Sequence, residues 1–538
     1  MSTPQLHHGE EHHDLAPNLT NVTTIEKKDL DGTITELGVD HSLGHIRDTH
    51  GLKGAVTNER ELHQGFSIPS LLAVAIMLGG AWANLFNTLA QTILFGGSVL
   101  LLYGIWVTGF GAILIYLSLA EFASTWPTSS GPQEWAFQLF PRRFKRFASY
   151  GVAWALSCLY LFATMGSTII LARQVISLAA FMHKDYVPTA AHIWAVNMAI
   201  LVVCGLINLF GVKAMDHLQI FSLVWFICGF FIWLIVPISL SPTKATAAEV
   251  FTGELNLSGW SNFVAFMIGL AGIMAGYGIP DAVTHLAEET NRPAVDLPRV
   301  MWLSPVISLV SATAMCLTFL FCGVSQITMA LNQTGTPYFD FLEATVKNQA
   351  GVVCMAVILI YSQFMACFQC QLASSRVIFT FAREGGAFLP KWLGSIQGRL
   401  QVPVWAILLN VFFCGALTLI LLGSETALNV FLNCTGTFAL VVYVPLIVMS
   451  LIKGRRFPRG AFFLGKWGWF VNIAAVVYML FVVIFFHFPY FKRWTPEYFN
   501  YNIAIVPGVM LIGLLCWFIS GRKHYIIHRN MDDVEGTM

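Results

Sequence analysis

Long apolar runs, separated by short polar stretches, follow one another along the chain from residue 62 onwards. The first run, residues 62–120, contains no Asp, Glu, Lys or Arg and is long enough for two membrane spans, at about 66–95 and 97–121. This pattern predicts an all-α polytopic membrane protein with twelve transmembrane helices. The other ten runs lie at about 147–181, 190–212, 217–240, 258–288, 300–323, 350–382, 402–423, 427–451, 467–488 and 502–521.

Polar residues flank this apolar region at both ends of the chain. Residues 1–60 hold no apolar run and are predicted to be a disordered tail, whereas residues 61–521 form the helical domain and residues 522–538 a short second tail. Placing the first tail inside puts most loop Lys and Arg residues on the inner side, as the positive-inside rule requires. We therefore expect both termini to be cytoplasmic.

The predicted sixth span, within residues 260–292, is interrupted. Gly276, Gly278 and Pro280 lie close together and disfavour a continuous helix. Asp281 follows at once, and an acid near the middle of a span is costly in lipid unless it faces a cavity or a partner. The interruption predicts a discontinuous helix at a substrate site; the alternative is a helix that simply ends at Pro280. Their spacing places three more polar side chains on the helical face of Asp281: Thr284, His285 and Glu288.

The predicted first span carries a second weak point, the pair Gly79 and Gly80. Paired glycines let another backbone or a ligand approach a helix, although close helix packing has the same requirement. If five helices repeat, the first and sixth spans occupy corresponding positions in two halves. The two breaks together therefore indicate an inverted-repeat secondary transporter with a site near the middle of the membrane.

Composition excludes several other classes of protein. Of the 538 residues, 56% are hydrophobic and 11% charged, and the net charge is +1, which fits neither a soluble enzyme nor a nucleic-acid-binding protein. No GxxxxGK[ST] phosphate-binding motif occurs, so an ion or solute gradient has to supply the energy for transport. The cysteines lie in apolar runs and predict no disulfide framework, and we expect no metal site and no cofactor.

Three stretches of the chain, taken in order, resemble a known family. Residues 109–141, GFGAILIYLSLAEFASTWPTSSGPQEWAFQLFP, are similar to the amino acid permease signature, with Glu121 ahead of the element WPTSSGP. Residues 281–289, DAVTHLAEE, and residues 373–386, which contain SSR and FAREGG, resemble elements of the fungal amino acid/choline permeases. That family, within the amino acid–polyamine–organocation superfamily, includes γ-aminobutyrate, choline and general amino acid carriers. The resemblance spans about residues 50–525 and implies twelve helices, the first ten as two inverted five-helix repeats.

The chemistry of an amino acid assigns candidate binding residues around the two breaks. A carboxylate needs N–H donors, which Gly79 and Gly80 can offer at the start of a half-helix. An ammonium needs carbonyl oxygens or an acid, which Gly276, Gly278 and Asp281 can offer. Three aromatic residues are expected either to shape the cavity or to pack in the core: Trp82, Tyr160 and Tyr277. In the cavity, their ring faces would also suit a quaternary ammonium such as choline.

Ionisable residues of the sixth span are candidates for coupling and gating. Asp281 or Glu288 is a candidate proton carrier, because burial makes a carboxyl group easier to protonate, and the resemblance implies proton symport or exchange. Glu288, Glu289 and Arg376 are expected to form ion pairs that gate the cytoplasmic side. The alternative for the two glutamates is a solvated helix end beside Arg292.

Together these patterns predict a secondary active transporter for amino acids or related amines, such as γ-aminobutyrate or choline. We expect coupling to H+ and residence in the lipid bilayer of a fungal plasma membrane, with neither an enzymatic activity nor a nucleic-acid partner. The alternative is a nutrient sensor on the same fold that does not transport. A sensor often has a long structured extension, which the short predicted tails do not offer.

Overall fold

The computed structural model describes residues 66–211, 214–325, 336–397, 400–422, 427–493 and 499–527, and their regular structure is helical. The predicted tail 1–60 and residues 528–538 lie outside the described residues. Within the described part, ten helices are long and apolar enough to cross a membrane, and α11 (Asn262–Ala275) and α17 (Val404–Thr418) are shorter apolar helices. The ten are α3 with α4 (Ile68–Asn87), α5 (Leu89–Thr125), α7 (Lys145–Met182), α8 (Ala190–Phe210), α9 (Met215–Leu240), α12 (Pro293–Phe321), α15 (Gln349–Arg383), α18 (Ala427–Ile452), α19 (Trp467–Phe486) and α20 with its continuation (Asn502–His524).

Each of these helices overlaps a predicted apolar run, although α5 begins at Leu89, inside the predicted first span, and the all-α polytopic class is confirmed. The agreement follows from the bilayer, because about 20 residues of apolar helix are needed to cross the hydrocarbon. The number of crossings and the inverted repeat stay predictions. The sequence did not predict the short helices in the connections: α6 (Pro132–Leu139), α10 (Ala247–Thr252), α14 (Tyr338–Val346) and α16 (Pro390–Leu393). It also did not predict that the last helix continues beyond residue 521 into α21 (Arg522–His524).

The first helix is broken at the predicted glycine pair. α3 (Ile68–Gly79) begins after the N-cap Ser67 and ends where Gly80 adopts a left-handed conformation with φ of 58°. α4 (Ala81–Asn87) continues beyond that residue. A further left-handed glycine, Gly97 with φ of 58°, kinks α5 at the place where the sequence puts the boundary between the first two spans.

The sixth helix is broken as well, but its second half differs from the prediction. α11 ends before Gly276, Gly278 is left-handed with φ of 74°, and the 3₁₀-helix η2 (Ala282–Glu289) follows. The prediction of an α-helix for this second half is therefore wrong, because residues 282–289 form a 3₁₀-helix. The Thr284 hydroxyl donates to the Asp281 carbonyl oxygen over 2.6 Å, and local bonds of this kind compete with α-helical hydrogen bonds.

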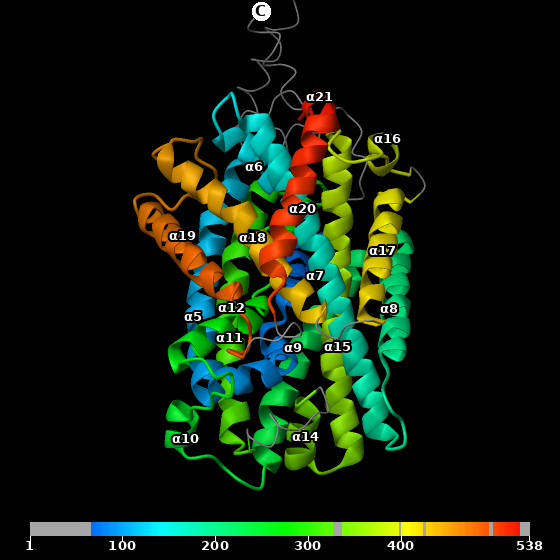
Figure 1. Ribbon diagram of the computed structural model, residues 1–538, viewed down its shortest axis with the longest axis vertical. Helices are drawn as coiled ribbons and strands as arrows, with labels where there is room; N and C mark the ends of the chain where they lie inside the picture. The colour runs from blue at the N-terminus through cyan, green and yellow to red at the C-terminus, as the bar shows by residue number, and fades with distance from the viewer. Residues whose placement is uncertain are drawn as a thin grey trace, which may run out of the picture. The chain divides into compact units, whose positions relative to one another are not determined.

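The broken helices lie between two groups of packed helices. α5 packs along α12 and α11, and α7 packs along α15 and α18, while η2 contacts both α12 and α15. Figure 1 shows α6, α16 and α21 at one end of the helices and α10 and α14 at the other. We call these the α6 end and the α14 end; the loop charges predict that the α6 end faces the cytoplasm.

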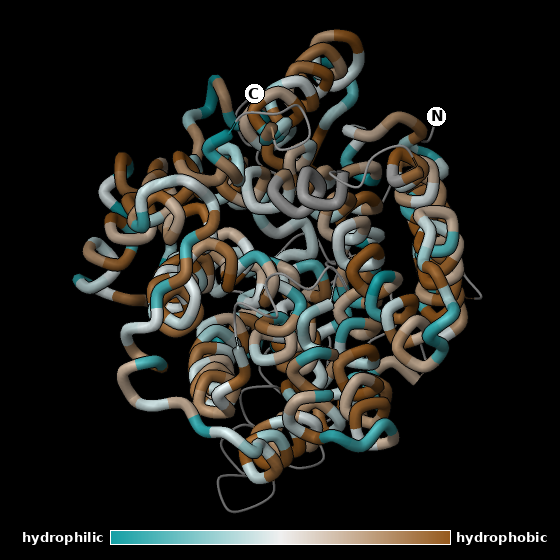
Figure 2. Tube along the Cα trace, turned by 60° about the horizontal axis from the view of Figure 1, so that its bottom comes forward, coloured by the Kyte–Doolittle hydropathy of each residue, from teal (hydrophilic) through white to brown (hydrophobic). Residues whose placement is uncertain are grey.

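Hydrophobic residues recur along the outer helices, as the brown stretches of the chain in Figure 2 show. α7 is buried over 72% of its most apolar stretch, whereas α9 is buried over only 22% and presents its other side outwards. Phe221, Val224 and Ile235 on α9 are each more than half exposed. A surface this apolar is stable against lipid rather than water, so the chain is an integral membrane protein.

Candidate substrate-binding site

The two helix breaks touch each other. A Cβ added at Gly79 would come within 2.4 Å of the Gly276 carbonyl oxygen and within 2.5 Å of the Gly278 nitrogen. Space therefore requires glycine at position 79. Gly80 differs, because a Cβ there would meet nothing closer than 3.8 Å, and only its left-handed backbone favours glycine.

A cavity of about 160 Å³ lies beside this contact. At about 30 Å³ for each water, that volume holds about five water molecules, which suits a small amino acid or amine. Gly79, Tyr277 and Gly278 form part of the wall, and no Asp, Glu, Lys, Arg or His occurs among the described residues that line it. A charged group of a substrate therefore has to be met by dipoles or ring faces. The polar side chains of the wall are Asn84, Tyr116, Ser167, Tyr277, Gln363, Cys370, Thr435 and Tyr443.

Two tyrosines hold the sixth-helix break in place. The Tyr116 hydroxyl on α5 donates to the Tyr277 carbonyl oxygen over 2.5 Å, and the Tyr277 hydroxyl donates to the Ile105 carbonyl oxygen over 2.7 Å. A break leaves backbone carbonyl groups without their helical partners, and a buried carbonyl group without a partner is costly. Tyr116 therefore stabilises the break as well as lining the cavity.

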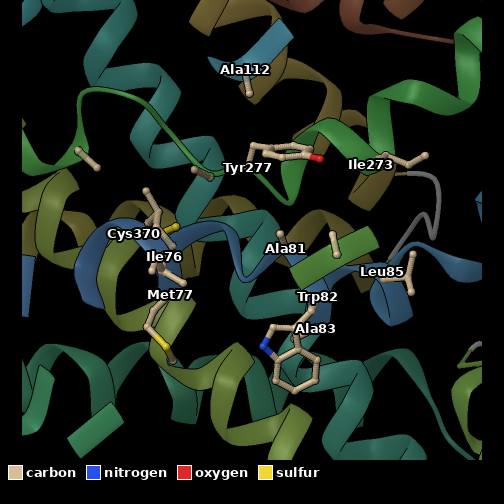
Figure 3. Packing of buried hydrophobic residues seen from close by; sticks show 14 of the residues in the cluster. Ile76, Met77, Ala81, Trp82, Ala83, Leu85, Ala112, Ile273, Tyr277 and Cys370 are labelled. Carbon is tan, nitrogen blue, oxygen red and sulfur yellow. The ribbon is translucent and has the colours of Figure 1, made fainter. Parts of the chain in front are cut away.

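The three predicted aromatic residues lie in different surroundings. Tyr277 lines the cavity. Trp82 is fully buried and points away from Tyr277 (Figure 3), with its ring centroid 5.0 Å from that of Phe226. Tyr160 is buried edge-on against His285, with 5.4 Å between the ring centroids. Trp82 and Tyr160 do not line the cavity, which matches the packing role that the sequence left open.

Asp281 is fully buried behind the cavity wall. One carboxylate oxygen accepts a hydrogen bond from the Tyr443 hydroxyl, and the other lies 2.7 Å from Nε2 of His285. Nδ1 of His285 lies 2.9 Å from the Ser129 carbonyl oxygen. An ammonium group in the cavity would meet Tyr443 before it met Asp281, so direct pairing of Asp281 with a substrate stays a prediction.

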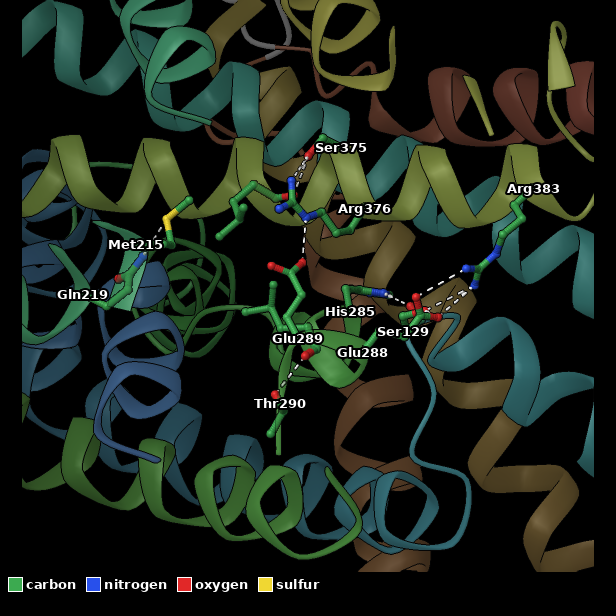
Figure 4. Close-up of polar contacts among 12 residues, drawn as sticks. Ser129, Met215, Gln219, His285, Glu288, Glu289, Thr290, Ser375, Arg376 and Arg383 are labelled. Carbon is green, nitrogen blue, oxygen red and sulfur yellow. Dashed lines mark hydrogen bonds and ion pairs between the residues drawn. The ribbon is translucent and has the colours of Figure 1, made fainter. Parts of the chain in front are cut away.

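Two ion pairs join η2 to α15 at the α6 end (Figure 4). The buried Arg376 Nε lies 3.1 Å from the carboxylate of Glu289, and Arg383 lies 3.0 Å from that of Glu288, with both partners 35% exposed. The Ser129 hydroxyl also donates to Glu288. The structure thus brings the three predicted gating residues to one place and gives each glutamate an arginine.

Neutral side chains form a second network on the far side of the cavity. The Asn87 amide donates to Gln363 over 2.8 Å and its oxygen accepts from Gln174 over 2.5 Å, while the Gln363 amide donates to the Ser167 hydroxyl over 3.0 Å. Phe66, just before α3, pairs with Thr290 at the end of η2, so the broken first helix starts near the ion pairs and its second half, α4, runs away from them. Asn87 is the last residue of α4, and its hydrogen bonds join that end of the helix to α7 and α15, opposite the ion pairs.

A further buried acid lies just beyond the end of α15. Glu384 accepts a hydrogen bond from the Ser130 hydroxyl over 2.9 Å, and its carbonyl oxygen accepts from the Ile526 N–H over 2.9 Å. Burial and the neighbouring Glu134 raise the pKa of Glu384 to about 7. Tyr525 is fully buried, so residues 525–527, just after α21, pack onto the α6 end.

Sequence reasoning did not assign several residues that the structure places at the site. Tyr443 and Asp281 are 162 residues apart, and no local pattern connects them. Arg383 had a usable signal, since it lies seven residues after Arg376 and so on the same face of α15. Ser129 and Tyr116 lie in the stretch 109–141 that resembles the permease signature, but the sequence assigned no role to either residue.

Comparisons with known proteins find similar chains along nearly the whole length. A family model described as amino acid permease matches residues 70–512. The choline transporter of Saccharomyces cerevisiae is 26% identical over 518 residues, which cover 95% of this chain and 90% of that protein. Amino-acid permease BAT1 of Arabidopsis thaliana is 25% identical over 517 residues, covering 91% of this chain and 98% of the relative. The BAT1 homolog of Oryza sativa is 26% identical over 492 residues, covering 87% and 93%.

Proposed function

Because this chain belongs to the amino acid permease family, we propose that it is a proton-coupled secondary active transporter for amino acids or related amines. The contact between two broken helices beside a cavity carries the proposal. Broken helices expose backbone N–H and C=O groups at the middle of a membrane, and transporters built from inverted repeats bind their solutes there. No enzymatic activity is part of the proposal.

The uncharged cavity supports a narrow class of substrates. A zwitterion such as γ-aminobutyrate is neutral overall, and the backbone dipoles at the two breaks suit its separated charges. A single positive charge, as on choline, suits the ring faces of Tyr116, Tyr443 and Phe486, at about 0.5–2 kcal/mol for each contact. A polyamine carries several positive charges and needs acids, which the described wall does not contain.

We further propose residence in the plasma membrane with the α6 end towards the cytoplasm. The basic residues of the loops support this orientation, since Arg and Lys gather in cytoplasmic loops. The proposed orientation puts both termini inside the cell. It also makes the two Arg–Glu pairs the inner closure of the transport path and the Asn87 network the outer closure.

Uptake into a host that lacks its own permeases tests the proposal. The labelled panel contains γ-aminobutyrate, choline, neutral and basic amino acids, and spermidine, and the amount of protein at the cell surface is measured in parallel. We expect γ-aminobutyrate, choline or a neutral amino acid to accumulate, more so at acidic external pH, and spermidine to stay out. Accumulation of spermidine would contradict the substrate class. Specific binding without uptake of any panel member would instead support the sensor.

A further inference from the structure

The geometry around His285 fixes how many protons the buried Asp281–His285 pair holds. A carbonyl oxygen only accepts hydrogen bonds, so the 2.9 Å contact with Ser129 requires a hydrogen on Nδ1 of His285. Nε2 then faces Asp281 across 2.7 Å, and neither a bare ring nitrogen nor a carboxylate can donate. One proton therefore lies between the two groups, either on the imidazole or on the carboxyl, and the pair is neutral overall in both cases.

The surroundings make this a site for one proton and for no other charge. Both side chains are fully buried, and the second carboxylate oxygen is occupied by the Tyr443 hydroxyl. Arg292, Arg376 and Arg383 on the neighbouring elements pair with Asp296, Glu289 and Glu288. Loss of the proton therefore leaves a negative charge that none of these three arginines compensates, which is costly in a buried site. The titratable side chains that interact with Asp281 are Tyr116, Tyr160 and Tyr443, and Cys370 interacts with Tyr160. The ion pairs on η2, α12 and α15 are Arg376 with Glu289, Arg383 with Glu288, and Arg292 with Asp296, while Arg299 on α12 is exposed.

The pair is connected to both the cavity and the inner closure. Tyr443 lines the cavity and donates to Asp281. Ser129 accepts from His285 through its carbonyl oxygen and donates to Glu288 through its hydroxyl, and Glu288 pairs with Arg383. Tyr443 therefore links the Asp281–His285 pair directly to the cavity wall. Ser129 links the same pair to the Arg383–Glu288 ion pair.

We propose that Asp281 and His285 together hold the proton that is transported with the substrate. This inference rests on the proposed function as a proton-coupled transporter. With the proton bound, the neutral pair holds η2 against Ser129 and the α6 end stays closed. Separation of η2 from Ser129 lets water reach the pair, so the O–H or N–H bond breaks and H+ leaves to that water. By linkage, the closed state binds the proton more tightly than the state open at the α6 end, which gives uptake of H+ from one side and release to the other.

Proteoliposomes that hold a pH-sensitive dye test the assignment. The probes are H+ and labelled γ-aminobutyrate or choline, whichever the uptake panel accepts. The variant His285→Gln keeps a hydrogen-bonding side chain but takes up no proton. We expect substrate counterflow within about threefold of the wild type, and substrate-driven acidification of the lumen at least tenfold lower. The matched control is His217→Gln, the same change at an exposed histidine on α9, which should behave as the wild type does in both measurements.

The outcomes separate this inference from the proposed function. Substrate transport by the wild type without acidification removes proton coupling itself, whatever the variants do. Acidification by His285→Gln at the wild-type rate overturns the assignment while leaving proton coupling in place. If size-exclusion chromatography shows that His285→Gln is misfolded, Asp281→Asn replaces it. The amide keeps an oxygen that accepts from Tyr443 and an N–H that donates to His285, but it takes up no proton, so acidification of the lumen should again be at least tenfold lower. Acidification by Asp281→Asn at the wild-type rate also overturns the assignment.

Discussion

Substitution of Gly79 by alanine tests whether the two helix breaks are in backbone contact. The added Cβ would lie 2.4 Å from the Gly276 oxygen, 2.5 Å from the Gly278 nitrogen and 2.8 Å from the Tyr277 carbonyl carbon. All three atoms belong to the backbone, so no side chain can turn away to make room. Because ordinary contact begins at 3.4 Å, the breaks have to separate by about 1 Å. Overpacking of this kind costs about 1–3 kcal/mol.

Substitutions at two other glycines distinguish a lack of space for a side chain from a requirement for left-handed backbone. At Gly80 a Cβ has room, so Gly80→Ala suffers only from its left-handed φ of 58°, which costs about 1–2 kcal/mol. Gly80→Asn should cost less, because asparagine adopts that conformation more readily. Gly151, inside α7, has nothing within 4 Å of an added Cβ, so Gly151→Ala should be neutral or stabilising by up to about 1 kcal/mol.

The assay combines the thermal unfolding midpoint in detergent with uptake at matched surface expression. We expect Gly79→Ala to unfold at a lower temperature and to lose uptake, since the displaced backbone forms the cavity wall. Gly80→Asn should keep most of its uptake, and Gly151→Ala all of it. If Gly79→Ala kept both the wild-type midpoint and wild-type uptake, the breaks would not be in contact and the cavity would have another wall.

Three more predictions concern the α6 end and the membrane orientation. The pKa of Glu384 rises from 4.5 to about 7 in the folded state, so between these pH values the folded state binds a proton that the unfolded state has lost. The free energy of unfolding should therefore fall by on the order of 3 kcal/mol as the pH rises from about 4.5 to 7, and stay level above pH 7. Thermal unfolding of Glu384→Gln across this range should show no such fall. Arg376→Ala leaves Glu289 buried and uncompensated and should cost about 3–5 kcal/mol, whereas Arg383→Ala, in a pair that is 35% exposed, should cost about 0–1 kcal/mol; equal unfolding midpoints would contradict the difference in burial. A reporter inserted after residue 245 should lie outside the cell and one after residue 395 inside; the reverse result would refute the orientation.

The helices and their breaks could be predicted because their causes are local. An apolar run of sufficient length specifies a span, and glycine or proline in such a run weakens the helix wherever it occurs. Gly80, Gly97 and Gly278 all adopt left-handed conformations at places that the sequence marks as breaks or boundaries. The 3₁₀ winding of η2 was not predictable in this way, since it depends on side-chain bonds such as that from Thr284 to Asp281.

The partners within the site could not be predicted because they come from distant parts of the chain. Tyr443 is 162 residues from Asp281, and Ser129 is 156 residues from His285. The sequence marks Asp281 as an acid that needs a partner in the membrane, but it does not say which one. The same holds for the two glutamates of η2: both were expected to form ion pairs with Arg376, while Arg383, the partner of Glu288, was not assigned a role.

The two proposed closures of the transport path differ in strength, and we expect this difference to decide which side opens first. Both join the broken helices to α15, at Gln363 on one side of the cavity and at Arg376 and Arg383 on the other. The outer closure consists of bonds between neutral groups, worth about 0.5–1.5 kcal/mol each, whereas bonds to charged groups are worth about 1.5–3 kcal/mol. The side away from the α6 end should therefore open first. Under the proposed orientation that side is the exterior. The Asp281–His285 proton site lies next to the stronger closure, so we expect it to take up a proton from outside before the α6 end opens.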